Sequence, residues 1–345
     1  MKAVNTPIFA TLAASMTMLM AGTAFAAPEV VVSIKPIHSL VASIMKGVAD
    51  PKLIVEGAAS PHTYSMKPSN ARAIQNADLI FWIGPNLEAF LDKPLDALAS
   101  TKKVVALMDA PDLEKLPFRE GGAFEAHDHG DGHDHHHEGE HAEAPKGEHA
   151  HEDHAAGKAH EEEEHEHAHE HGGFDAHLWL DPMNAKALGR EIAKRLVEID
   201  PEHAKQYEDN AAGLMRQLDE LDSEIKTTVA PVKDKPFIVF HDAYQYFEKR
   251  YQVKVAGSIT VSPETLPGAE RIGEIHSKVT ELGATCVFAE PQFTPKLVDV
   301  VIEGTPAQAG TLDPEAATLK EGPDLYFQLM RGIATSLKTC LSGKA

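Results

Sequence analysis

The sequence predicts an α/β protein with two lobes, each built on a mainly parallel sheet flanked by helices, and one long helix that joins the lobes. Three observations support this fold. Short apolar, β-rich runs alternate with helical patterns, as in the βαβ units that form parallel sheets. This alternation occurs twice, before and after a long amphipathic helical stretch. A chain of 345 residues also suits two domains better than one.

The first alternation of strands and helices occupies a lobe that we place at residues 27–183. Runs rich in Val, Ile and Leu indicate the strands, and apolar residues spaced three or four apart indicate the helices between them. The expected strands are 30–34, 53–55, 79–83 and 104–107, and the expected helices are 36–46, 68–76 and 86–99.

Two helices are expected to link the lobes over residues 184–230. They start at Asp181-Pro182 and Asp200-Pro201, because Asp is a good N-cap and proline is favoured at the first helical position. Apolar residues of the second helix recur as far as Val229, so it would span on the order of 40 Å at about 1.5 Å per residue. The same apolar residues could instead form the interface of a dimeric coiled coil. This apolar stretch is short, however, and lies between two αβ regions, which favours a helix that links the two lobes.

The second alternation occupies a lobe that we place at residues 231–345. The same two patterns, apolar runs and helical spacing, define its elements. The expected strands are 237–240, 253–259, 285–289 and a short one near 309, and the expected helices are 243–250, 267–282, 294–303 and 324–341.

The first 26 residues have the pattern of a secretory signal peptide. Lys2 precedes an apolar, Met- and Ala-rich stretch, and Ala24-Phe25-Ala26 is a small-x-small site, so we expect cleavage after Ala26. No later stretch approaches the ~20 apolar residues of a membrane-spanning helix, and no cysteine before Cys286 could carry a lipid. We therefore expect a periplasmic protein without a membrane anchor.

Acidic residues and histidines are concentrated in the segment 124–171, which holds sixteen Asp and Glu against Lys146 and Lys158, and fifteen of the 21 histidines. The formal net charge of −21 argues against nucleic acid and anionic membranes as partners, because both would repel the chain. The segment has almost no apolar side chains to bury, so we expect a disordered surface loop that binds divalent metals weakly. Two functional interpretations of this segment are equally supported: a trap that collects zinc, and a dispensable insert.

The chain has two cysteines, Cys286 and Cys340. An even number in an exported chain favours a disulfide, and two buried free thiols are the alternative. A bridge would close a loop of 54 residues, which is worth roughly 4 kcal/mol in the chain-entropy model.

Six histidines lie outside the histidine-rich segment, and three of them follow expected strands. His241 ends an apolar run, His62 lies in a loop after residues 53–55, and His177 lies beyond the last strand of the first lobe. Ligands bind at the carboxyl ends of strands in open parallel sheets, so these residues predict a site between the lobes. Three neutral imidazoles with one open position suit zinc. The others, which we interpret as locally hydrogen-bonded, are His38, His203 and His276.

Two carboxylates at strand ends are candidates for a fourth ligand. Asp313 lies in Gly310-Thr311-Leu312-Asp313-Pro314, and Glu290 directly follows the strand that ends at Ala289. A helix cap for Asp313 and a loop hydrogen bond for Glu290 are the alternative roles. We rank Asp313 ahead of Glu290, with water as an equal competitor.

Four motifs carry a family resemblance: Gly57-Ala58-Ala59-Ser60-Pro61-His62-Thr63-Tyr64-Ser65, Asp175-Ala176-His177-Leu178-Trp179-Leu180-Asp181-Pro182, Phe240-His241-Asp242-Ala243-Tyr244 and Ala289-Glu290-Pro291-Gln292-Phe293. Together they resemble the zinc-binding periplasmic components of bacterial ABC importers, the ZnuA type. The likeness runs from about Val30 to the C-terminus. It implies two αβ lobes joined by a long helix, a Zn²⁺ site between them, and delivery of the ion to an inner-membrane permease driven by an ATPase.

Residue by residue, the resemblance puts the family's three histidine ligands at His62, His177 and His241. The family's disulfide resembles a pairing of Cys286 with Cys340. Manganese-binding relatives have a carboxylate at the position of His241, so histidine here favours zinc. Some zinc members have Glu directly before the first histidine. Pro61 occupies that position here, so the resemblance implies no carboxylate ligand there.

The sequence does not favour an enzyme. His137-Glu138-Gly139-Glu140-His141 matches H-E-x-x-H, but a disordered tract with an internal glycine does not hold two histidines on one helix face. The sequence has no G-x-S-x-G elbow and no G-x-x-x-x-G-K-[ST] phosphate loop. We therefore expect a monomeric zinc carrier. The alternatives are a manganese or iron carrier of the same fold, a metallohydrolase with Glu290 as its base, and a zinc buffer that works through the segment 124–171.

Overall fold

The computed structural model describes residues 27–98, 103–119, 124, 173–260, 262–263, 266–283 and 286–343. The expected signal peptide and all of the histidine-rich segment except Phe124 lie outside these residues. Within the described part of the chain, no helix has both the length and the apolar character needed to cross a membrane.

The first lobe contains a parallel sheet, as predicted, and its four strands have the order β2-β1-β3-β4. The two central strands, β1 and β3, are buried along their whole length, which explains their unbroken apolar sequence. The strands are β1 (Val30–Val32), β2 (Lys52–Leu53), β3 (Leu79–Trp82) and β4 (Lys103–Ala106). The helices are α1 (Lys35–Ile44), α2 (Pro68–Asn76) and α3 (Ala89–Asp96), and a 3₁₀ turn, η1 (Leu107–Asp109), follows β4.

The second lobe repeats this topology with a parallel sheet of order β6-β5-β7-β8. Its central strands β5 and β7 are largely buried, whereas the edge strand β8 is mostly exposed. The strands are β5 (Pro236–His241), β6 (Lys254–Thr260), β7 (Cys286–Ala289) and β8 (Gln308–Thr311). The helices are α6 (Gln245–Tyr251), α7 (Ala269–Glu281), α8 (Lys296–Ile302) and α9 (Leu325–Leu341).

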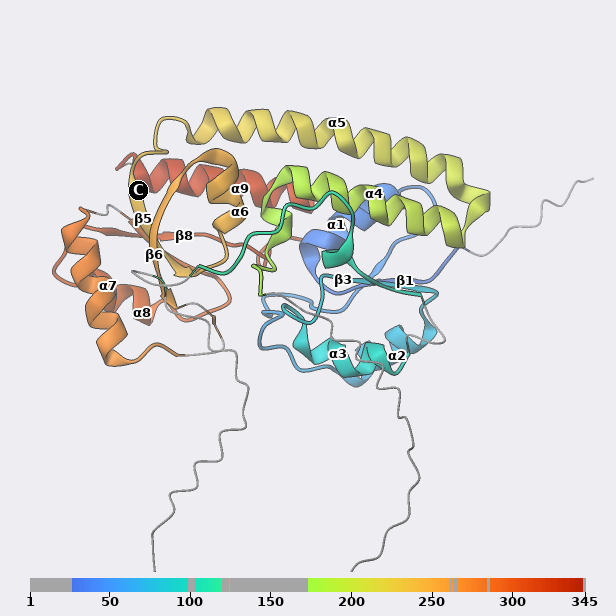
Figure 1. The fold of residues 1–345 in the computed structure, drawn as a ribbon, viewed down its shortest axis with the longest axis horizontal. Helices are drawn as coiled ribbons and strands as arrows, with labels where there is room; N and C mark the ends of the chain where they lie inside the picture. The colour runs from blue at the N-terminus through green and yellow to red at the C-terminus, as the bar shows by residue number, and fades with distance from the viewer. Residues whose placement is uncertain are drawn as a thin grey trace, which may run out of the picture.

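Two helices connect the sheets, α4 (Pro182–Ile199) after the 3₁₀ turn η2 (Leu178–Leu180), and α5 (Ala204–Val229) after the turn η3 (Pro201–His203). Figure 1 shows α5 running over both lobes, where it packs against α1, α4 and α9. The buried residues that recur on its inner face are Tyr207, Leu214, Leu218, Leu221, Ile225 and Val229. The apolar seam predicted from the sequence therefore packs within the chain.

The two Asp-Pro sequences start their helices in different ways. The Asp181 carboxylate accepts a hydrogen bond from the backbone amide of Met183, as an N-cap does. The Asp200 side chain makes no such bond, and a 3₁₀ turn precedes α5. Its carboxylate instead accepts from the Tyr207 hydroxyl at 2.7 Å and contacts Nδ1 of His203 at 2.7 Å.

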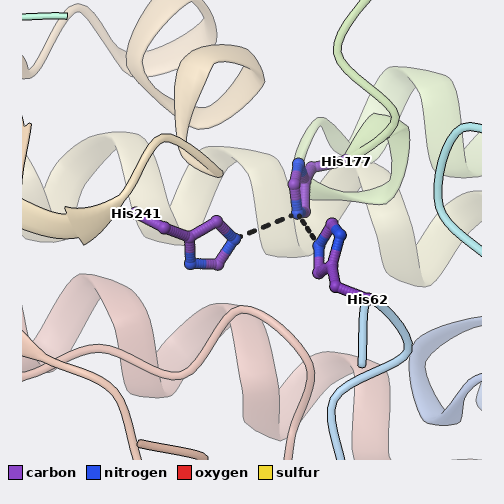
Figure 2. A group of neighbouring side chains, drawn as sticks. All are labelled: His62, His177 and His241. Carbon is purple, nitrogen blue, oxygen red and sulfur yellow. Dashed lines mark hydrogen bonds between the residues drawn. The ribbon is translucent and has the colours of Figure 1, made fainter. Parts of the chain in front are cut away.

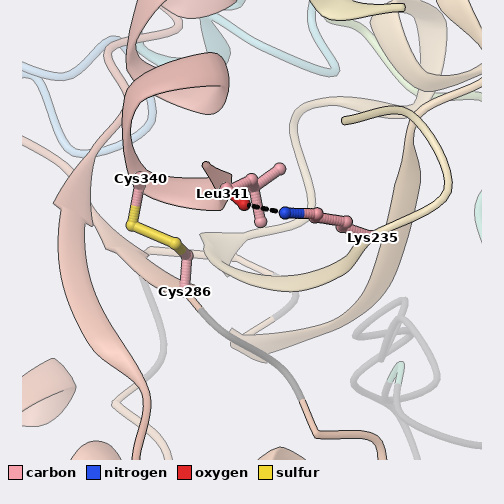
Figure 3. Close-up of a disulfide and its surroundings, with 4 residues drawn as sticks. All are labelled: Lys235, Cys286, Cys340 and Leu341. Atoms are coloured by element: carbon pink, nitrogen blue, oxygen red, sulfur yellow. Dashed lines mark hydrogen bonds between the residues drawn. A yellow bond between two sulfur atoms is a disulfide. The ribbon is translucent and has the colours of Figure 1, made fainter. Parts of the chain in front are cut away.

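A disulfide joins Cys286, the first residue of β7, to Cys340 near the end of α9 (Figure 3). Both cysteines are buried. Beside the bridge, the Lys235 ammonium donates to the carbonyl of Leu341 at 2.5 Å. These contacts fix the last helix to the amino end of the second sheet.

One hydrophobic core runs through both lobes. It extends from the first sheet under α1, α4 and α5 to α6 and α9, and a smaller core lies between the second sheet, α7 and α8. Polar contacts also cross between the lobes. The Tyr246 hydroxyl donates to the carbonyl of Asp175 at 2.7 Å, and Arg119 pairs with Asp242 and Glu248. The carboxyl ends of the two sheets thus meet at a seam held by both packing and hydrogen bonds.

Candidate metal centre

Three histidines from three separate segments of the chain meet at this seam (Figure 2). His241 is the last residue of β5 and His177 directly precedes η2. His62 lies in the loop between β2 and α2. His177 and His241 are buried, and the His62 side chain is 11% exposed. The structure thus brings together the three histidines that the sequence put forward.

The rings point their Nε2 atoms at one another. Nε2 of His177 lies 3.3 Å from Nε2 of His62 and 3.3 Å from Nε2 of His241. Two nitrogens that each bind a tetrahedral zinc ion at about 2.0–2.1 Å lie about 3.3 Å apart. His177 therefore has the spacing to both other histidines that one tetrahedral zinc ion needs, and the ligand atoms of all three lie within 4.8 Å of one another.

Carboxylates fix the orientation of two of the rings. The Asp175 carboxylate accepts from Nδ1 of His177 at 2.7 Å and from its backbone amide at 2.9 Å. Glu290 accepts from Nδ1 of His241 at 2.7 Å. Because the Nδ1 atoms are the donors, neutral His177 and His241 carry their lone pairs on Nε2, where two lone pairs face each other without a proton between them. A cation resolves that conflict, and such carboxylate–histidine pairs are typical of metal sites.

The surroundings affect the histidine pKa values in opposite directions. Burial, together with the neighbouring His177 and His241, holds the pKa of His62 well below its usual value. Burial also lowers the pKa of His241, but the Glu290 carboxylate, with smaller contributions from Asp242 and Asp175, outweighs it and raises that pKa overall. His62 therefore stays neutral to lower pH than His241 does.

Asp313 and Glu290, the fourth-ligand candidates, have other partners in the structure. Asp313 accepts hydrogen bonds from Nε2 of Gln292 at 3.2 Å and from the amides of Glu315 at 3.2 Å and Thr318 at 3.4 Å. Its two oxygens thus hold the loop between β8 and α9 in shape. Glu290 holds His241, as described above.

Glu315 is a residue that the sequence analysis missed. Its Oε1 lies 3.9 Å from Nε2 of His62, its side chain is 6% exposed, and neither oxygen has a hydrogen-bond partner among the described residues. Burial, with the charges of Glu290 and Asp313, holds the pKa of this carboxyl well above its usual range. The sequence feature that could have indicated Glu315 is its position two residues after Asp313, in the same loop. An unpaired carboxyl beside three converging imidazoles fits a divalent cation.

The remaining histidines lie outside the cluster and have local partners, as expected. Nε2 of His38 contacts the carbonyl of Pro51 at 2.9 Å, and Nδ1 of His276 contacts that of Val301 at 3.0 Å. His203 pairs with Asp200. Within the described part of the chain, His62, His177 and His241 form the one group of histidines, cysteines or carboxylates spaced to hold a metal ion.

Known proteins resemble this chain over nearly its whole length. A family model described as the periplasmic component A of a zinc-uptake complex, ZnuA, matches residues 30–340. The high-affinity zinc uptake system protein ZnuA of Brucella suis biovar 1 is 61% identical over 313 residues, 91% of each chain. The protein of the same description from Paracoccus denitrificans is 38% identical over 315 residues, 91% of this chain and 92% of the other.

A solved structure shares the fold. The periplasmic zinc-binding protein TroA from Treponema pallidum superimposes with a TM-score of 0.71 at 20% sequence identity, over 91% of this chain and 99% of the other. At that identity the likeness concerns the two-lobed architecture alone, and it agrees with the arrangement of sheets and helices in Figure 1.

Proposed function

The chain belongs to the ZnuA family of periplasmic zinc-uptake components, and on this premise we propose that it captures Zn²⁺ between its lobes for an ABC importer. The observation that carries the proposal is the convergence of three imidazoles, with Nε2 of His177 at a zinc-like 3.3 Å from Nε2 of both His62 and His241. The loaded protein would then deliver its ion to an inner-membrane permease driven by an ATPase.

The ligands we propose are His62, His177 and His241. For the fourth position we favour Glu315 over Asp313, because both Asp313 oxygens are engaged within the loop whereas both Glu315 oxygens lack partners among the described residues. A rotation of the Glu315 side chain would bring Oε1 from 3.9 Å to the edge length of a zinc tetrahedron, about 3.3 Å. Water is the other occupant of that position.

Zinc is favoured over manganese and iron by the ligand type. Three imidazoles suit zinc, whereas manganese prefers carboxylate, carbonyl and water oxygens. The alternative carrier function is tested by competition between Zn²⁺ and Mn²⁺ for the purified protein. Equal affinity for the two ions would overturn the assignment of zinc as the cargo.

A hydrolytic function has less support. A metallohydrolase needs a general base near metal-bound water, and the strongest candidate in the sequence was Glu290. Both oxygens of that carboxylate accept from Nδ1 of His241, at 2.7 and 2.8 Å, so Glu290 orients a proposed ligand. The family is one of transport components, and we propose that this chain works without catalysis.

The location and assembly of the protein follow from the same proposal. Export through the signal peptide, with cleavage after Ala26, would release the chain into the periplasm as a monomer. Residues 124–171 would serve as an accessory region that gathers zinc near the centre, and the three-histidine site would provide the tight binding. The zinc-buffer hypothesis assigns the tight binding to residues 124–171 instead.

Zinc titration against a competing chelator tests the proposal. We expect one tight site in the chain from Ala27 onward and its loss when His62, His177 and His241 are all replaced by alanine. A variant with His203→Ala and His276→Ala is the matched control and should keep the tight site. Tight binding that survives the triple substitution would move the site to residues 124–171 and leave a zinc buffer as the function.

A further inference from the structure

The loop that carries Glu315 belongs to the second lobe but is held by side chains of the first. Trp179 donates from Nε1 to the carbonyl of Pro314 at 2.8 Å. The Lys35 ammonium donates to the carbonyl of Ala316 at 3.2 Å. The residues on both sides of Glu315 are therefore fixed from across the lobe seam.

Lys35 makes further contacts with the same loop. Its ammonium also donates to the carbonyls of Ala317 at 3.0 Å and Leu319 at 2.9 Å, and it lies 3.6 Å from the Glu321 carboxylate. An ammonium has three N–H donors, and the three loop carbonyls can accept all of them. This explains how a lysine can be only 5% exposed.

The stability of its own helix does not explain the position of Lys35. It is the first residue of α1, and a cation at a helix N-terminus is unfavourable because the helix dipole is positive there. The compensating interactions come from residues 281 to 284 positions away in the sequence. Lys35 is thus placed to serve the loop.

The backbone of the loop needs such support. Ala316 is fully buried and has φ of 59°, a left-handed conformation that residues with a Cβ seldom adopt. Its carbonyl is one of the three that accept from Lys35. Ala316 directly follows Glu315, so Lys35, by holding the Ala316 carbonyl, supports the backbone beside Glu315, whose Oε1 lies 3.9 Å from Nε2 of His62.

We propose that Lys35 is a positioning residue that presents Glu315 to the bound metal and thereby makes tight metal binding depend on contact between the lobes. When the lobes are together, the ammonium holds the loop with Glu315 beside His62. When they separate, the loop loses Lys35 and Trp179, and Glu315 is withdrawn. This inference rests on the proposed zinc site and adds to it a link between ion affinity and lobe contact.

A double-mutant cycle tests the inference in the full chain. Lys35→Met keeps the length of the side chain and removes the donors, and we expect it to raise the zinc dissociation constant by about tenfold, the scale of outer-shell effects on metal sites. In the Glu315→Gln background the same substitution should change the constant by less than twofold, because its effect passes through Glu315. Lys46→Met, at an exposed lysine just beyond α1, is the matched control and should leave zinc affinity unchanged.

An absorption spectrum of the bound metal distinguishes a role of Lys35 in positioning Glu315 from a general loss of structure. With Co²⁺ as the probe, the d–d absorption of the wild-type protein should change in Lys35→Met in the same way as in Glu315→Gln. Lys35→Arg keeps the charge but cannot direct three donors to one set of carbonyls, so it should show the same change if Lys35→Met fails to fold.

Two outcomes would overturn the inference. In the first, Lys35→Met, or Lys35→Arg in its place, keeps the zinc affinity and the Co²⁺ spectrum of the wild type. In the second, the substitution at Lys35 reduces zinc affinity equally in the wild-type and Glu315→Gln backgrounds. Neither would affect the proposed function, which the triple histidine variant tests separately.

Discussion

Glu290 accepts a hydrogen bond from Nδ1 of His241 at 2.7 Å, although the two residues lie 49 positions apart in the chain. They meet because β5 and β7 are neighbours in the second sheet, and each residue stands at the carboxyl end of its strand. The bond keeps the proton on Nδ1 and leaves the Nε2 lone pair directed at His177.

Glu290→Gln should weaken zinc binding by about ten- to a hundredfold, because loss of the carboxylate charge lowers the basicity of the His241 ring. Chelator competition at pH 7.5 measures the effect. Glu303→Gln, at an exposed carboxylate after α8, is the control and should bind zinc as the wild type does. Unchanged affinity in Glu290→Gln would contradict the role of Glu290 in orienting His241.

Zinc affinity should fall as pH drops, because the ligands must be neutral to bind the ion. The pKa of His241 is raised from its usual 6.5, so protons compete at this ligand already above pH 6.5, whereas His62, with its pKa lowered by burial, is protonated later. The dissociation constant should therefore begin to rise above pH 6.5. Dissociation constants measured between pH 8 and pH 5 test this, and a flat profile would exclude a histidine site. In Glu290→Gln the fall should begin at lower pH, since Glu290 raises the pKa of His241.

Stability of the metal-free protein should carry a contribution from Glu88. This carboxyl is fully buried and accepts from the Ser33 hydroxyl at 2.5 Å and from the amides of Ile83 and Gly84 at 3.1 and 3.0 Å. Burial outweighs these bonds and raises its pKa from 4.5 to about 7. The folded state therefore binds this proton more tightly than the unfolded state does. The contribution of Glu88 to the free energy of unfolding should decline as pH rises from 4.5 to 7, by about 3 kcal/mol at most. Above pH 7 this contribution should stay at its lower value.

Denaturant unfolding of the wild type and Glu88→Gln, each without metal, measures that contribution. Because glutamine does not titrate, the variant should lack this decline. Its free energy of unfolding should therefore increase relative to that of the wild type as pH rises from 4.5 to 7. A difference between the two proteins that does not vary between pH 4 and pH 8 would show that Glu88 has an ordinary pKa.

Removal of the disulfide should reduce stability without changing zinc affinity. Cys286 and Cys340 are 54 residues apart, so the chain-entropy model gives a loss of roughly 4 kcal/mol in the double alanine variant. Cys286 begins β7 whereas Glu290 follows its other end, which separates the bridge from the metal centre. Denaturant unfolding and chelator competition on the same variant measure the two quantities. A large loss of zinc affinity would show that the bridge also holds the site in shape.

The succession of strands and helices, and the three histidines, could be predicted from local patterns. Apolar runs such as residues 237–240 are buried strands because both faces of a parallel sheet are covered, and that condition is visible in the sequence. The carboxyl ends of parallel strands lie on the same side of a sheet. His62 and His241, which lie at or beyond the carboxyl ends of strands in different lobes, can therefore be assigned to one cleft from the sequence alone.

The sequence by itself thus determined the two-lobed α/β fold and the three histidines that converge, because hydrophobic periodicity and turn chemistry depend on near neighbours in the chain. Only the tertiary structure decided what each polar group contacts. Three of these contacts join residues far apart in the sequence. Glu290 and His241 are 49 residues apart, Glu315 and His62 are 253 apart, and Lys35 and Ala316 are 281 apart. Those contacts depend on side-chain direction and on one left-handed backbone angle at Ala316, which a local pattern does not encode.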